Sequence, residues 1–299
     1  METEDSELCF PELINSSCVK GVVNSLVTTL LIVLEFITAL STAFLNLLVI
    51  ISVSHFRQLL SSSNFILLSL AVSEFFIYLM IYPFEVLYPY TCWFWGDLLC
   101  FLKSIFSVMI VSASVGTMVL ISVDRYVAVC DPLHYSTRMS VKVVSVGLSL
   151  CWSSSFHFSL VFLDKNMEDL NFPRPCYGKC FYRVTFPLVL FELILTFFLP
   201  VVIVVLYMRV FVVVLSQVRA MHSHISAITF GPSATGNAKK SEVKAAKNLG
   251  VAVVVFLICF IPYYILILPW NLSKDSSFLV FLGRLLLLNS CFNPFLYVL

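Results

Sequence analysis

Long apolar runs separated by short polar segments dominate the pattern of this chain. Seven runs are long enough to cross a bilayer as helices, since about 20 residues span the hydrocarbon core. They lie near residues 25–53, 63–88, 100–126, 141–163, 184–214, 244–269 and 276–298. The pattern predicts an all-α membrane protein, a bundle of seven transmembrane helices preceded by a tail at 1–24. The long polar stretch 216–243 is expected to be a flexible cytoplasmic loop.

Composition supports a membrane protein and argues against one class of partner. Of 299 residues, 60% are hydrophobic and only 12% are charged, which is more apolar surface than a soluble domain needs. The net charge of +1 argues against a nucleic-acid partner. Membrane lipid is therefore the expected surrounding of most of the chain.

The polar segments predict the orientation. With the N-terminus outside, the cytoplasmic segments hold ten lysine and arginine residues against Asp124, Asp131 and Glu242. This is the distribution that the positive-inside rule describes. Both N-x-S/T sequons, at Asn15 and Asn271, then lie outside and are candidate glycosylation sites. We expect a multi-pass protein of the plasma membrane with an extracellular N-terminus.

Six of the ten cysteines fall in or beside the same outside segments. An oxidising compartment favours disulfides among them. The six residues are Cys9, Cys18, Cys92, Cys100, Cys176 and Cys180. The other four lie in or near the predicted spans and are expected to stay reduced.

Motifs inside the seven runs resemble those of rhodopsin-like G-protein-coupled receptors. They are Asn46 in FLNLLVI, LAVSE ending at Glu74, Cys100, Asp124-Arg125-Tyr126, Trp152, Pro200, CFIP around Pro262 and NPFLY at 293–297. ISVDRYVAVCDPLHY and the cysteines of CYGKC further resemble the trace-amine-associated receptors, in particular fish olfactory members with an acid on helix five. The resemblance implies a receptor domain at 25–298, no enzymatic activity, an amine ligand and a heterotrimeric G protein of the stimulatory type.

An acid in the middle of an apolar run marks the candidate ligand site. Glu192 lies in FPLVLFELILTFFLP, where a charged group costs about 2.5–3.5 kcal/mol on insertion scales and needs compensation. The resemblance implies an amine-binding Asp 18 residues before Arg125, but this chain has Ser107 there. We predict that Glu192 neutralises a protonated amine and that Ser107 is a hydrogen-bonding partner.

Aromatic residues around Pro262 are candidates for the walls of the same site. Phe260, Tyr263 and Tyr264 can surround a cation through cation–π contacts. In a chain with 28 Phe, packing between helices or against lipid explains them equally well.

Several alternatives remain open. Lys103 or Arg284 can pair with Glu192 internally, or can make the receptor suit a zwitterionic or acidic ligand. The sequence ends at Leu299, without the amphipathic helix eight and tail of the family, so a truncated receptor with impaired signalling is another alternative. A channel or transporter is the alternative of a different class, although repeated halves and charged rings are missing.

The resemblance also implies a cytoplasmic switch and a buried polar network. Glu242 is the expected resting partner of Arg125. The switch residues are Asp124, Arg125, Tyr126, Glu242, Asn293, Pro294 and Tyr297, and the network residues are Asn46, Glu74, Asn289 and Ser290. Because Glu74 is longer than the family's Asp, we expect a water network in place of a sodium ion. No other metal or cofactor is expected.

Three finer expectations concern disulfides and side chains near the ends of the spans. The resemblance implies the pairs Cys100–Cys180 and Cys18–Cys176, with Cys9 as a rival for the tail position and Cys92 left over. Tyr207 follows Pro200 by seven residues where the family has eight, so a rotation of about 100° should keep it from its usual partner near Arg125. Glu85 is expected to be solvated.

Overall fold

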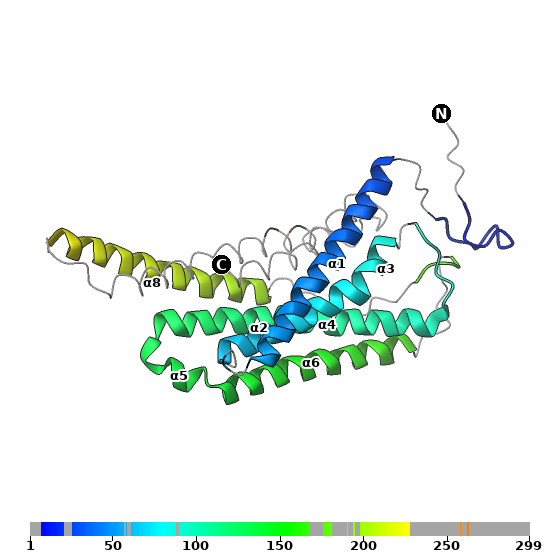
Figure 1. The fold of residues 1–299 in the computed structure, drawn as a ribbon. Helices are drawn as coiled ribbons and strands as arrows, with labels where there is room; N and C mark the ends of the chain where they lie inside the picture. Colours follow the sequence, from blue (N-terminus) through cyan, green and yellow to red (C-terminus); the bar gives the residue numbers. More distant parts are fainter. Residues whose placement is uncertain are drawn as a thin grey trace.

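The fold is built from helices that follow the predicted spans. The computed structural model describes residues 7–20, 26–56, 58, 61–87, 90–167, 176–180 and 198–227, with single positions 190, 194, 258 and 262. The elements in order are α1 (Leu26–His55), α2 (Ser62–Phe76), the π-helical turn η2 (Ile77–Ile81), α3 (Tyr82–Leu87), α4 (Gly96–Cys130), η3 (Pro132–His134), α5 (Tyr135–Arg138), α6 (Val141–Met167) and α8 (Leu199–Ala227) (Figure 1). The predicted spans 244–269 and 276–298 lie outside the described residues, apart from the single positions 258 and 262.

Four described segments are long and apolar enough to cross a membrane. They are Thr28–His55, Ser62–Leu87, Gly96–Cys130 and Val141–Val161, and Leu199–Val214 is a shorter apolar stretch of α8. The four segments coincide with the first four predicted spans. The part of the chain that the structure describes is thus a bundle of membrane-length helices, consistent with the predicted seven-helix bundle.

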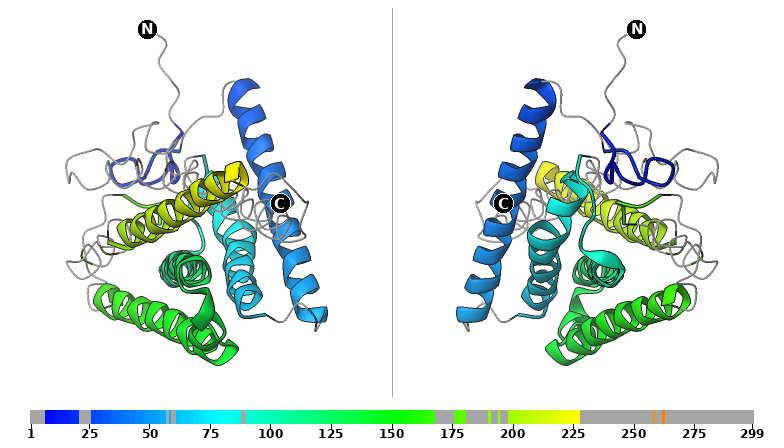
Figure 2. Two further views of the ribbon diagram at one scale, coloured as in Figure 1. Left: turned by 90° about the vertical axis from the view of Figure 1, so that its left-hand side faces the viewer. Right: turned by 90° about the vertical axis from the view of Figure 1, so that its right-hand side faces the viewer.

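Helix α4 forms the centre of the described bundle. It packs against α2, α6 and α8, while α1 packs against α2; Figure 2 shows α4 nearly end-on among its neighbours. Close helix contacts rely on small residues, because lipid supplies no hydrophobic force between helices. Gly116 on α4 illustrates this, since a Cβ there would lie 2.3 Å from the Sγ of Cys151 on α6.

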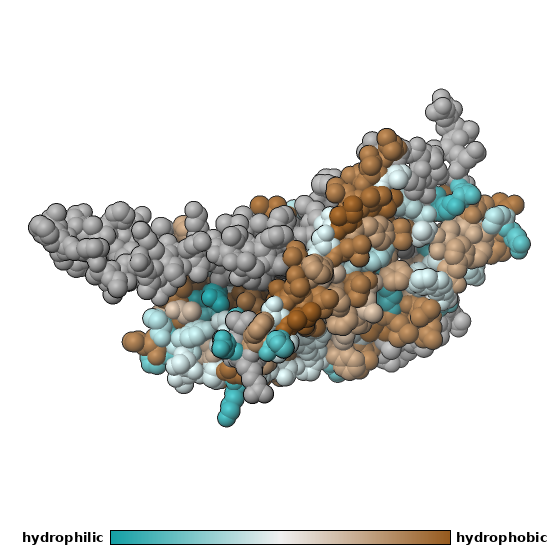
Figure 3. Space-filling model, viewed as in Figure 1, coloured by the Kyte–Doolittle hydropathy of each residue, from teal (hydrophilic) through white to brown (hydrophobic). Residues whose placement is uncertain are grey.

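Apolar side chains also cover the outer surface of the bundle. Leu34, Leu40 and Phe44 on α1 are exposed, and a hydrophobic band runs along this helix in Figure 3. Such a band is expected for a helix whose outer face contacts lipid.

The π-helical turn η2 precedes a proline inside the second span. Pro83 has no N–H, and its ring would crowd the carbonyl four residues earlier in an α-helix. The backbone instead widens into a π-helical turn, in which the N–H of Tyr82 bonds to the carbonyl of Ile77. The extra residue rotates α3 by about 100° relative to a continuous helix and so sets the direction of Glu85.

Helix α8 extends beyond the predicted span. It continues to Ala227, past residue 216, where we expected the flexible loop to begin. The polar composition of this stretch prompted that expectation. However, Gly or Pro first appears at Gly231 and Pro232, so no strong helix breaker interrupts the polar turns before them.

Candidate functional site

Three disulfides lie at one end of the described bundle, and two of them anchor the N-terminal tail. Cys18–Cys176 and Cys100–Cys180 are the two pairs that the resemblance implies. The third, Cys9–Cys92, joins the tail to the segment between α3 and α4. The expectation that Cys92 would be left over is therefore wrong.

The fold of the tail explains this third disulfide. An antiparallel bridge pairs Leu8 with Val19, and the N–H of Cys9 donates to the carbonyl of Cys18 across 2.8 Å. The tail thus bends back on itself, so that Cys9 reaches the loop before α4 and Cys18 reaches the loop after α6. Gly178 packs closely against Cys9 of the tail. Its φ is +103°, which favours glycine, and a Cβ there would lie 2.4 Å from the Cβ of Cys9.

Backbone hydrogen bonds join the folded tail to the loop after α6. Tyr177 donates to the carbonyl of Ser16 and accepts from the N–H of Cys18, each across 2.7 Å, and Trp93 donates to Gly178 across 2.8 Å. Asn15 of the first sequon is exposed on the adjoining turn. The tail (7–20), the loop before α4 (90–95) and the loop after α6 (176–180) together form one unit, which we call the cap.

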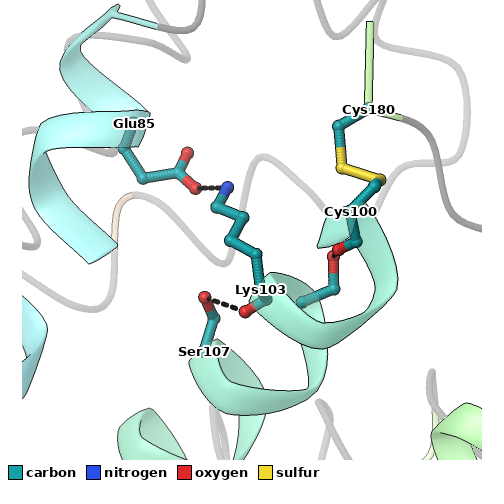
Figure 4. A network of polar contacts seen from close by, with 6 residues as sticks. Glu85, Cys100, Lys103, Ser107 and Cys180 are labelled. Carbon is teal, nitrogen blue, oxygen red and sulfur yellow. Dashed lines mark hydrogen bonds and ion pairs between the residues drawn. A yellow bond between two sulfur atoms is a disulfide. The ribbon is translucent and has the colours of Figure 1, made fainter. Parts of the chain in front are cut away.

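An ion pair lies beneath this cap, between α3 and α4. Nζ of Lys103 contacts Oε1 of Glu85 at 2.5 Å, and the hydroxyl of Ser107 donates to the carbonyl of Lys103 across 2.8 Å (Figure 4). Cys100, one turn toward the cap, carries the disulfide to Cys180. We expected Glu85 to be solvated. Its side chain is 45% exposed, but its carboxylate is also paired with a lysine, which the sequence did not predict.

All of the other predicted ligand residues lie outside the described residues. The same holds for part of the switch, part of the polar network and the second sequon. The residues concerned are Glu192, Phe260, Tyr263, Tyr264, Arg284, Glu242, Asn289, Ser290, Asn293, Pro294, Tyr297 and Asn271.

Glu74 and Asn46 are buried in the middle of the bundle. The hydroxyl of Ser114 on α4 donates to Oε1 of Glu74 across 3.2 Å, and the amide of Asn46 donates to the carbonyl of Thr42 across 3.0 Å. A buried carboxylate needs such donors, because its desolvation is otherwise uncompensated. Ser114 is therefore a member of the polar network that sequence reasoning missed.

The opposite end of α4 carries a hydrogen-bonded cluster around Asp124. Nη2 of Arg125 lies 3.0 Å from Oδ2 of this buried carboxylate. Ser63 on α2 donates to the same Oδ2 across 2.9 Å, and the hydroxyl of Tyr135 donates to Oδ1 across 2.8 Å. Ser63 and Tyr135 were not predicted, since only the fold shows that the segment after α4 turns back onto its end.

Tyr207 reaches the same region. Its side chain is buried and lies near Ser122, one turn before Arg125. The expectation that the one-residue shift keeps Tyr207 from its usual partner near Arg125 stays a prediction. Tyr207 belongs to the buried hydrophobic cluster to which α2, α4, α6 and α8 contribute.

The short helices after α4 add polar contacts and an exposed apolar residue. Asp131 contacts His134 at 2.7 Å and Arg138 at 3.2 Å. The hydrogen bond with His134 holds the pKa of Asp131 below its ordinary value, and the positive charge of Arg138 acts in the same direction. Leu133 between them is 89% exposed.

Comparison with known proteins agrees with this geometry. Residues 45–297 match the model of the 7 transmembrane receptor (rhodopsin family). Trace amine-associated receptor 13c of Danio rerio is 33% identical, over 99% of this chain and 89% of its own length. Trace amine-associated receptor 4 of Mus musculus is 34% identical over 97% and 87%, and trace amine-associated receptor 1 of Homo sapiens is 31% identical over 95% and 88%.

The chain belongs to the rhodopsin family of seven-transmembrane receptors and, within it, to the trace amine-associated receptors. Its class is that of a multi-pass plasma-membrane G-protein-coupled receptor. Members of this class are signalling receptors and not enzymes.

Proposed function

We propose that this receptor binds a protonated amine, that Glu192 neutralises the ammonium group, and that the hydroxyl oxygen of Ser107 accepts a hydrogen bond from it. The observation that carries the proposal is the 2.5 Å contact between Lys103 and Glu85. Lys103 was one of two rivals for Glu192, and its charge is already compensated by another carboxylate. Glu192 is then left with Arg284 or with the ligand as its partner.

The chemistry at position 107 supports the same ligand class. A serine hydroxyl carries no charge, so it cannot replace the carboxylate that the family resemblance implies there. An ammonium group buried in a receptor needs an anion, because an uncompensated charge costs several kcal/mol. Glu192 supplies that anion in this proposal, and the names of the relatives favour an amine.

The two ends of the described bundle support a proposal for the orientation. We propose that the N-terminus is extracellular, because three disulfides gather at the tail end and disulfides form in oxidising compartments. Arg125, Arg138 and Lys142 lie toward the other end, in agreement with the positive-inside rule. Asn15, exposed in the tail, is then the glycosylation site nearest to the cap, with Asn271 the second.

At the cytoplasmic end, Arg125 and Leu133 support a docking role for a G protein, which we propose to be of the stimulatory type. Arginine and exposed apolar side chains are typical anchors of protein interfaces. In the resting receptor, Glu242 pairs with Arg125, and ligand binding favours the state in which this pair is open.

A ligand panel on the receptor tests the amine proposal. The panel contains monoamines, diamines, amino acids and carboxylic acids, and the readout is nucleotide exchange on a purified G protein. Glu192→Gln is expected to abolish the response to amines, while Arg284→Ala leaves it intact. Loss of the response in both variants would instead indicate an internal Glu192–Arg284 pair, and an equal response to neutral ligands would contradict the proposal.

A further inference from the structure

One side of α6 is polar although it points away from the bundle. Helix α6 packs against α4 and α2, and it is the least buried and least apolar of the four membrane-length segments; Figure 2 shows it at the periphery. Its inward side carries the buried residues Val144, Leu148, Ser155 and Ser159. The opposite side exposes Ser149, Ser153 and His157, spaced four residues apart, which we call the α6 polar face.

The α6 polar face lies at the depth of the hydrocarbon core. The membrane-length segment of this helix is Val141–Val161. At 1.5 Å per residue, Ser149 lies about 12 Å and His157 about 24 Å along the helix from Val141. Because the core is about 30 Å thick, the face extends from the middle of the bilayer toward its outer part and contacts no bulk water.

Lipid is a poor cover for this face. Histidines in membrane spans almost always face the interior of the bundle, whereas His157 is exposed and its imidazole makes no hydrogen bond or ion pair among the described residues. The hydroxyl of Ser153 donates to the carbonyl of Ser149 in the same helix, and its oxygen can still accept. Acyl chains offer neither donors nor acceptors, so they leave the imidazole without a partner.

The chemistry of the α6 polar face suits a second copy of the same face. Ser149 and Ser153 follow the spacing of small residues that lets two membrane helices approach closely. Serine and a neutral imidazole both donate and accept hydrogen bonds, so two copies can satisfy each other. Lys142 on the same side lies at the end of the segment, where long side chains extend to the interface, so the two lysines need not meet in the core.

We propose that the α6 polar face binds a second copy of this receptor and that the receptor forms a two-fold symmetric dimer in the membrane. Copies in one membrane have the same orientation, so the symmetry axis is normal to the bilayer and brings each residue of the face near its own counterpart. Ser149 and Ser153 allow the helices to approach, and His157 forms hydrogen bonds across the interface. The inference does not depend on the proposed amine site.

Energy transfer between donor- and acceptor-labelled receptors tests the dimer. The purified full chain, labelled at the N-terminus, is reconstituted in phosphatidylcholine vesicles at a series of protein-to-lipid ratios. Energy transfer is expected to rise and saturate along the series, which gives an association constant. If energy transfer stays at the level of random proximity at every ratio, lipid or a different protein covers this face, and the proposal is overturned.

Three variants locate the interface on α6. Ser153→Leu blocks the close approach, and His157→Leu removes two symmetry-related hydrogen bonds; each is expected to lower the association constant about tenfold. His157→Asn keeps a donor and an acceptor and should retain the association constant within about threefold. The matched control is Ser41→Leu, which replaces an exposed serine on α1 and should change nothing. Wild-type association in both leucine variants of α6 would refute the dimer.

Cross-linking tests the symmetry of the interface. Ser153→Cys is expected to form an intermolecular disulfide under mild oxidation, because the residue meets its counterpart, whereas Ser41→Cys is not. Wild type gives the baseline, since it already contains the free cysteines Cys130 and Cys151. The altered side chains are exposed, so melting temperatures in detergent are expected to match wild type. Cross-linking of Ser41→Cys without cross-linking of Ser153→Cys would place the interface on α1 and contradict the proposal.

Discussion

The hydroxyl of Tyr135 donates a hydrogen bond to the buried carboxylate of Asp124 across 2.8 Å. Ser63 and Arg125 contact the other oxygen of the same group, so three donors surround one buried charge. Such donors compensate the desolvation of a carboxylate. They also tie α2, α4 and the short helices after α4 together, at the end of the bundle where we propose that the G protein docks.

Tyr135→Phe removes one of these donors. Leaving a buried carboxylate with one partner fewer costs about 1–3 kcal/mol, so a lower melting temperature is expected. Because the same carboxylate contacts Arg125, nucleotide exchange without ligand is expected to rise.

Thermal unfolding and ligand-free nucleotide exchange measure both effects. Ser136→Ala is the control, since Ser136 is exposed on the same short helix and should change neither quantity. A wild-type melting temperature for Tyr135→Phe would show that the hydrogen bond contributes nothing to stability.

The third disulfide should contribute to stability and to the order of the tail. Cys9 and Cys92 are 83 residues apart, and loss of a disulfide that closes a long loop typically costs about 2–4 kcal/mol. The double variant Cys9→Ser with Cys92→Ser is expected to melt at lower temperature and to lose its tail faster under limited proteolysis. Cys130→Ser is the control, because Cys130 is a free cysteine. Identical melting and proteolysis in all three proteins would argue against this contribution.

Gly116→Ala tests the close contact between α4 and α6. Its Cβ would meet Sγ of Cys151 at 2.3 Å, and overpacking of this kind costs about 1–3 kcal/mol. Adding Cys151→Ala removes the clashing sulfur and should restore most of the loss. Gly147→Ala is the matched control, because its Cβ would approach only the flexible end of Leu120, at 3.4 Å. Equal melting temperatures for both glycine variants would disprove the tight contact.

Leu133→Ala addresses the exposed apolar residue on η3. If this side chain is an anchor for the G protein, the variant should lower coupling about tenfold without changing ligand affinity. Paired measurements of nucleotide exchange and ligand binding separate the two effects. Leu40→Ala on the outer face of α1 is the control, since Leu40 is also an exposed leucine. Unchanged coupling in Leu133→Ala would exclude the anchor.

The features that sequence alone predicted best depend on local properties of the chain. Span length follows from the apolar runs, which is why four membrane-length segments coincide with predicted ones. The pairs Cys18–Cys176 and Cys100–Cys180 were implied by a family resemblance that rests on short motifs. Glu192 stood out for the same kind of reason, since a charge inside an apolar run is rare, but its role stays a prediction.

The features that were missed depend on contacts between distant segments. Cys9 reaches Cys92 only because the tail folds back through the bridge between Leu8 and Val19. Glu85 faces Lys103 after a π-helical turn that no hydrophobic pattern reveals. Tyr135 was not singled out from the sequence, and its hydroxyl reaches Asp124 because the segment after α4 turns back onto the end of that helix.

The most direct test of the receptor's proposed chemistry is to move its carboxylate. Nucleotide exchange in response to a primary amine is measured for wild type, Glu192→Gln, and Glu192→Gln combined with Ser107→Asp. The account predicts a response in wild type, none in the single variant, and recovery in the double variant, because an acid at position 107 can again neutralise the ammonium group. A wild-type response in Glu192→Gln would contradict it.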